Sequence, residues 1–430
     1  MKMLRYKRRL NPLEEHWFGW FVCLIATLFY CYEYILRMVP SVMTGELMRH
    51  YGIGVVGFGW LTDSYLISYT AMQFFVGPVM DYCGLRKSLL LALISCIVGS
   101  ILFAYAPSFW FAFIGRFFIG FGSSFAFVGV LRLVSLWLPA HFFSFFSGFT
   151  TALGMLGAML GDIFLVHWVK QTGWASVIYA TAMTGVILLP MFFLFVIEKS
   201  TPVLIPRRSA KKFLLKVVQV VKNKNIFLPG FIGSFMFSTL CVFADVWGIR
   251  FNQNILHLSL FQSGKVNSML YLGWLIGSPI VGILSEYAQN RKAFLFFGCL
   301  GASICFLILL YGGVHSYNQA AFLMLLLGLF SSAEILCFAV GKESVEEGFI
   351  ASAIGAVNFL VMLGGMILLP LVSHFLSLYW TGVTVDHVKV YSFLGYRNAL
   401  LIIPIGLLLS ALFSLMISPF PRNKRKSGSK

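Results

Sequence analysis

An eleven-residue stretch occurs twice in this chain and constrains its fold more than any other feature. The first copy, residues 77–87, reads GPVMDYCGLRK, and the second, residues 282–292, reads GILSEYAQNRK. Both copies begin with glycine, place an acid at the fifth residue and tyrosine at the sixth, and end in Arg-Lys. Because the copies lie 205 residues apart in an apolar chain, they predict that one half of the protein is repeated.

The composition predicts that lipid is the solvent of most of the chain. Of 430 residues, 59% are hydrophobic and only 11% are charged. The net charge of +17 could suggest a nucleic-acid partner. However, the bases occur in short segments between long apolar runs, which is typical of the cytoplasmic loops of membrane proteins. We therefore expect a lipid bilayer and no nucleic acid as the surroundings of this chain.

The apolar runs predict an all-α membrane protein, because a membrane-spanning helix needs about 20 apolar residues. Twelve segments satisfy this length, near residues 17–40, 55–79, 88–106, 109–131, 142–166, 174–197, 227–249, 264–286, 293–313, 319–341, 349–372 and 396–418. With the repeat, they predict two six-helix halves, 1–197 and 227–430, joined by a basic linker, 198–226. We expect a monomer.

Lysine and arginine predict the orientation of the chain. They gather at residues 2–9, 86–87, 198–226, 291–292 and 422–426, whereas most loops on the opposite side are poorer in bases. By the positive-inside rule, both termini and the linker are expected in the cytoplasm. The linker could be a helix on the anionic inner leaflet or a solvated loop.

Enzyme chemistry is not indicated by this sequence. It contains no GxSxG, HExxH, Walker or dinucleotide-binding motif in a fitting context. The eight cysteines are scattered and form no CxxC pair, so neither a zinc site nor a disulfide framework is expected. We expect no cofactor and no metal.

Ionisable residues within the predicted spans are the candidate functional residues, because each costs about 2.5–3.5 kcal/mol at the centre of a membrane helix. The first span places Tyr30, Glu33, Tyr34 and Arg37 on one face. This face could bind a small-molecule substrate in a cavity between the halves. Alternatively, Glu33 and Arg37, four residues apart, could form a purely structural ion pair.

Other polar residues in the spans extend this candidate site. Asp63 and Glu334 are expected to be buried acids that could carry a coupling proton, as could Glu33. Asp245 falls close to the end of its span and is expected to be interfacial. Asn358 could bind a polar ligand or make an interhelical hydrogen bond.

The repeated stretch resembles the signature loop of the major facilitator superfamily of transporters. Gly77, Asp81, Gly84 and Arg86 match that signature, although Leu85 stands where a base is usual, and the second copy lacks the second glycine. The resemblance implies a cytoplasmic loop whose acid and bases contact neighbouring helix ends as part of a gate. It implies this gating role for Gly77, Asp81, Gly84, Arg86, Lys87, Gly282, Glu286, Arg291 and Lys292.

Further segments are similar to other features of the same superfamily. Arg116, followed by Gly120 and Gly122, resembles its second signature, which implies proton coupling, although a packing or pairing role is an alternative. The fifth span lacks the Gly-Pro pair that is typical of exporters in this superfamily, which favours import. The segment YEYILRMVPSVM is similar to a subgroup that includes intraphagosomal amino-acid transporters.

These features together predict a proton-coupled secondary transporter for a small polar or anionic solute, with an amino acid as the candidate. It would work by alternating access between the two halves. An exporter of a siderophore, drug or organic acid, or a non-transporting membrane receptor of the same fold, are the alternatives.

Overall fold

The computed structural model describes residues 12–40, 43–53, 55–196, 223–314, 316–346, 349–385 and 388–417. The basic residues expected at the two ends of the chain, and residues 198–222 of the expected linker, lie outside this description.

Long helices build almost the whole of the described structure. The elements of the first half are α1 (Pro12–Met38), α2 (Thr44–Tyr51), α3 (Val55–Cys83), α4 (Leu85–Ala104), α5 (Phe109–Ser123), α6 (Ala126–Trp137), η2 (Ala140–Phe142), α7 (Phe143–Thr172) and α8 (Trp174–Phe195). Those of the second half are α10 (Lys224–Ser238), η3 (Thr239–Trp247), α11 (Gly248–Ile255), α12 (Leu260–Ala288), α13 (Arg291–Tyr311), α14 (Tyr317–Ser331), η4 (Ser332–Glu334), α15 (Ile335–Glu343), α16 (Ile350–Ser377), β1 (Trp380–Val385), β2 (Val388–Tyr391), α17 (Phe393–Leu400) and α18 (Ile402–Ser414).

Many of these helices are long enough to cross a membrane. Within the described residues, ten helical segments are long and apolar enough to cross a membrane. Two more helices, α3 and α7, have 29 and 30 residues. The predicted count of twelve spans and the predicted internal repeat stay predictions.

One short hairpin departs from the expected all-helical fold. Strands β1 and β2 pair antiparallel just before α17. Their sequence is rich in valine and threonine, which favour strands, and the segment is too polar and too short to cross a membrane.

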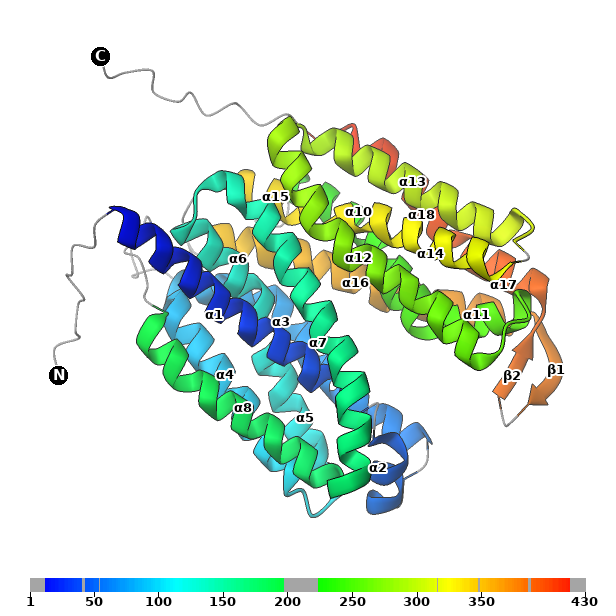
Figure 1. Cartoon of the computed structure of the whole chain (residues 1–430), viewed down its shortest axis with the longest axis horizontal. Helices are drawn as coiled ribbons and strands as arrows, with labels where there is room; N and C mark the ends of the chain where they lie inside the picture. Colours follow the sequence, from blue (N-terminus) through cyan, green and yellow to red (C-terminus); the bar gives the residue numbers. More distant parts are fainter. Residues whose placement is uncertain are drawn as a thin grey trace.

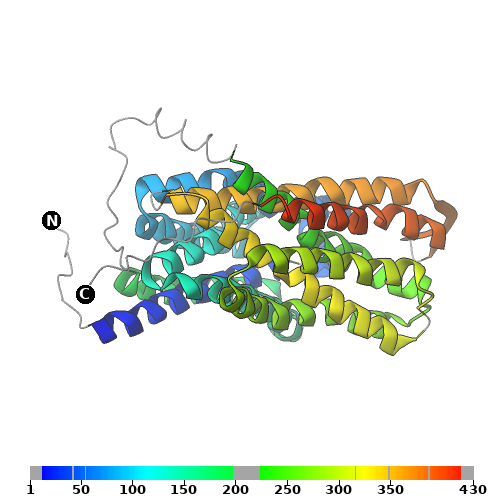
Figure 2. The same ribbon diagram turned by 90° about the horizontal axis from the view of Figure 1, so that it is seen from above.

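The helices form two bundles that lie side by side (Figures 1 and 2). One contains α1 to α8 and the other α10 to α18. We call the end that carries Asp81 and Glu286 the motif end, and the opposite end, which carries α2 and α11, the far end. At the far end the two bundles diverge, with α2 on the first bundle and the β1–β2 hairpin on the second lying well apart (Figure 1).

Glycines let the bundles touch backbone to backbone near the motif end. Helix α3 packs on α16, and α7 packs on α12. A Cβ atom at Gly77 would lie 2.2 Å from the carbonyl oxygen of Ala351, and one at Gly282 would lie 2.5 Å from that of Ser144. No side chain fits at either position without moving a helix.

This packing predicts that Gly77→Ala separates α3 from α16. We expect a melting temperature lower by several degrees in detergent, because backbone atoms rather than flexible side chains occupy the space. The control is Gly264→Ala in α12, where no atom lies within 4 Å of the added methyl group. An unchanged melting temperature for Gly77→Ala would contradict the close approach.

Candidate functional site

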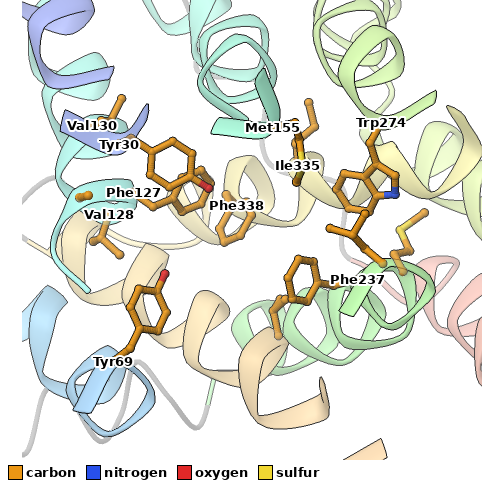
Figure 3. Close-up of a cluster of buried hydrophobic side chains, with 14 of the residues drawn as sticks. Tyr30, Tyr69, Phe127, Val128, Val130, Met155, Phe237, Trp274, Ile335 and Phe338 are labelled. Atoms are coloured by element: carbon orange, nitrogen blue, oxygen red, sulfur yellow. The ribbon is translucent and has the colours of Figure 1, made fainter. Parts of the chain in front are cut away.

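A small cavity lies at the boundary between the two bundles. Aromatic side chains from both sides surround it, with Tyr30, Tyr69 and Phe127 facing Phe338 and Phe237 (Figure 3). Its complete lining is Tyr30, Tyr34, Arg37, Tyr69, Phe127, Thr151, Met155, Phe237, Trp274, Glu334, Phe338, Asn358 and Met362. The cavity volume is about 30 Å³, which holds one or two water molecules and no larger solute.

The polar face predicted for the first span divides between two environments. Tyr30, Tyr34 and Arg37 line the cavity, and the hydroxyl of Tyr30 donates a hydrogen bond to that of Tyr34 at 3.4 Å. Glu33 is 1% exposed and instead accepts a hydrogen bond from the Tyr65 hydroxyl on α3. Its other carboxylate oxygen, Oε2, is buried and has no hydrogen-bond partner among the described residues.

The ion pair considered between Glu33 and Arg37 is not formed within the described structure. The Arg37 guanidinium makes no hydrogen bond or ion pair with any described residue and lies 5.8 Å from the centroid of the Tyr34 ring. Because Glu33 turns toward α3 while Arg37 turns toward the cavity, the two side chains do not reach ion-pair distance, although each still acts on the other's charge.

Glu334 is the most isolated acid of the cavity. It is 5% exposed, and its carboxyl group makes no hydrogen bond or ion pair with any residue in the described ranges. It ends η4, a single 3₁₀ turn between α14 and α15. A buried carboxylate without a partner is costly, so the site favours a bound proton or a cationic ligand beside it.

Asn358 bridges the two bundles. Its side-chain nitrogen donates to the Gln73 oxygen at 2.7 Å, and the Gln73 nitrogen donates to the Ser124 carbonyl at 3.3 Å. The interhelical alternative considered for Asn358 is therefore present, and the residue also lines the cavity.

Arg116 holds the end of α1 rather than lining the cavity. Its guanidinium donates to the Leu36 carbonyl at 2.9 Å and lies 4.8 Å from the centroid of the Tyr65 ring. Tyr65 thus touches both Glu33 and Arg116. These contacts are of the packing kind considered as the alternative for Arg116, and its part in proton coupling stays a prediction.

Asp63 does not fit the prediction that it is a buried acid, and this prediction is wrong. It is exposed, as are Trp60, Leu66 and Ile67 on the same helix. The buried face of α3 carries Tyr65 and Tyr69 instead. Residues 60, 63 and 67 share one helix face because they are three and four positions apart, and this face turns away from the core.

Residues missed at the sequence level lie in the wall of the cavity, as Tyr69 does, or contact the residues beside it, as Tyr65 and Gln73 do. Tyr65, Tyr69 and Gln73 follow one another at intervals of four, which is a readable signal for one face of α3. Phe127, Phe237 and other aromatic lining residues gave no comparable signal, since the chain has 45 phenylalanines.

At the motif end, each acid of the repeated stretch contacts a helix start in the other bundle. Asp81, in the last turn of α3, accepts hydrogen bonds from the backbone nitrogen of Ser352 at 2.8 Å and from its hydroxyl at 2.6 Å. Glu286 accepts one from the Ser144 hydroxyl at 2.8 Å. Ser352 and Ser144 lie in the first turns of α16 and α7, where the helix dipole favours an anion. The expected contacts of Asp81 and Glu286 are present.

The bases of the two copies are used differently. Arg291 pairs with Glu286 at 2.7 Å and with Glu343 at 2.6 Å. Its counterpart Arg86 donates to the carbonyl of Phe193 in the last turn of α8, while Asp81 lies 3.8 Å from Arg132. Lys87 is exposed and Lys292 is half-buried.

Gly84, within the first copy, has a backbone conformation that only glycine adopts readily. Its φ of 97° lies in the left-handed region and turns the chain from α3 into α4.

Comparison with known proteins agrees with this geometry. Residues 22–369 match the family model described as Major Facilitator Superfamily. The chain belongs to the Major Facilitator Superfamily. Members of this family are transporters and not enzymes, and its apolar helices make this chain a multi-pass membrane protein.

Individual relatives are distant. The fold is similar to a crystal structure of a double-tryptophan variant of XylE, with a TM-score of 0.70 and 15% identity over 94% of this chain and 96% of that one. The multidrug resistance protein Stp of Mycobacterium tuberculosis (strain CDC 1551 / Oshkosh) is 26% identical over 162 residues. That match covers 37% of this chain and 30% of Stp.

The motif-end contacts predict that Asp81→Asn loosens the closed end. The Asp81 side chain is 1% exposed, and it loses its charge opposite Arg132 and the start of α16. We expect a shift of about tenfold or more toward conformations open at this end, since charge-assisted hydrogen bonds contribute roughly 1.5–3 kcal/mol.

Spin labels at Lys87 and Glu346, one on each bundle, measure this opening as a longer distance. Glu46→Gln removes a half-exposed acid of α2 at the far end, whose ion pair with Arg49 stays within α2, and serves as the control. An unchanged distance distribution for Asp81→Asn would remove the proposed importance of the contact.

Proposed function

We propose that this protein is a proton-coupled secondary transporter that moves a small polar or anionic solute, with an amino acid as the candidate. Twelve helices in two repeated six-helix halves would rock about the central cavity and expose it alternately to each side. We place the protein in a bacterial inner membrane as a monomer, with both termini and residues 198–226 in the cytoplasm.

The isolation of Glu334 is the observation that carries this proposal. An ionised carboxyl group in its position lacks any described partner to offset the loss of water. A proton removes this cost, and opening of the cavity to water on one side lets that proton leave. Proton movement and the opening of one side are then coupled through a single group.

Other residues of the site have separate proposed roles. Arg37, with no described ion-pair partner, supplies a planar fork for a carboxylate of the solute. Tyr30, Tyr34 and Asn358 contact the solute beside it. Glu33 is a second proton carrier, positioned by Tyr65.

The motif-end acids act as the gate. Asp81 and Glu286 would hold the cytoplasmic side shut while the other side is open, and both contacts must break when the halves rock.

Export is the second candidate function. It is favoured by the partial match to Stp, whose name is multidrug resistance protein, and by the aromatic walls of the cavity. A drug exporter would accept apolar cations and need no partner for Arg37. The direction of solute flux in vesicles with an imposed pH gradient distinguishes import from export.

Glu334→Gln tests the proton site. We expect loss of accumulation driven by a pH gradient in reconstituted vesicles, because the amide cannot release a proton, while exchange of solute across the membrane continues. Uptake of labelled L-leucine is the measurement, and Asp63→Asn, an exposed acid outside the cavity, is the control. Retained proton-driven accumulation in Glu334→Gln would exclude this role.

Orientation is tested independently of transport. A reporter enzyme that is active only in the cytoplasm, fused at Lys212, is expected to be active in intact cells, because the bases of residues 198–226 favour the inner side. Activity of only a periplasmic reporter at this site would reverse the proposed topology.

A further inference from the structure

A second charged group faces Arg37 from the other bundle. Asp245 was expected to be merely interfacial, and it is exposed. It nevertheless lies close enough to Arg37 and Tyr34 of α1 to act on their charges, although Glu33 of α1 acts on both more strongly. The exposed side of Asp245 therefore faces the space between the bundles.

Three helices place polar groups at the far-end side of the cavity or just beyond it. On α1, Arg37 follows the lining residues Tyr30 and Tyr34. On α10 and η3, Asp245 lies two turns beyond the lining residue Phe237. On α12, which runs from the far end, Tyr271 lies one turn before the lining residue Trp274.

The local structure holds Asp245 in place. It lies in η3, a π-helical segment of the kind that often occurs at functional sites. The Tyr271 hydroxyl donates a hydrogen bond to its carboxylate. Arg37 and Asp245 do not form a direct ion pair in the described structure, so each retains capacity for a ligand.

We infer that Arg37 and Asp245 together bind a zwitterion, and that the solute is an α-amino acid with an apolar side chain. This inference rests on the proposed function. Arg37 takes the carboxylate, Asp245 with Tyr271 takes the ammonium, and the wall of Phe127, Phe237 and other aromatic residues takes the side chain.

The arrangement also explains how binding couples to movement. The two charges of an α-amino acid sit on one carbon atom, so both bundles must approach the ligand at once. A zwitterion therefore draws the far ends together, whereas an anion or an amine alone engages only one bundle.

Three related probes test the inference on the full-length protein. They are L-leucine, 4-methylpentanoate, which lacks the amino group, and isopentylamine, which lacks the carboxylate. We expect the unmodified protein to bind leucine roughly 10- to 100-fold more tightly than either analogue, since each loses one charge-assisted interaction. Binding is measured by calorimetry in lipid nanodiscs.

Variants assign each charge. Asp245→Asn is expected to weaken leucine binding to the level of 4-methylpentanoate and to leave binding of 4-methylpentanoate unchanged. Arg37→Met is expected to weaken leucine binding to the level of isopentylamine and to leave binding of isopentylamine unchanged. Asp245→Glu is expected to restore part of the preference for leucine over 4-methylpentanoate, which separates the loss of charge from misfolding. Asp63→Asn is the matched control.

The outcomes distinguish this inference from the proposed function. Equal binding of leucine and 4-methylpentanoate, or an equal loss of both in Asp245→Asn, overturns the zwitterion site while proton-coupled transport of an anion can stand. Absence of leucine binding also overturns the inference. Retained proton-driven accumulation in Glu334→Gln, with the leucine preference intact, overturns the proposed function alone.

Discussion

Contact between the two bundles at the motif end is the constraint on which the rest of the structure depends. Gly77 and Gly282 let backbones meet, and this brings Asp81 and Glu286 against helix starts of the opposite bundle. Without the glycines the acids would not reach their partners. Without the acids, the helix starts would lose the negative charge that their dipoles favour.

Polar groups at the motif end and in the cavity differ in how well they are satisfied. Asp81 has hydrogen bonds to Ser352 and a nearby Arg132, whereas Glu334 has no described partner. Satisfied buried groups fix one arrangement of helices. Unsatisfied ones leave a cost that a proton or a solute can offset, which is what a transport site requires under our proposal.

Several features of the site followed from sequence alone, and others did not. The acids of the repeated stretch were expected to contact bases or helix starts, and they do. The polar face of the first span was expected as well, yet Glu33 and Arg37 face different neighbours. Asp63 was expected to be a buried acid, and its side chain is exposed. Helical periodicity gives the angle between side chains on one helix, but not how that helix is rotated against the next.

The sequence by itself determined that the chain lies in lipid, that its helices are long, and that glycines and acids recur at matching places. These are local properties, set by composition and spacing. Only the tertiary structure decided which charges stay unpaired. That depends on how the helices are rotated against one another and on the π-helical segment that contains Asp245, and neither is a property of one helix alone.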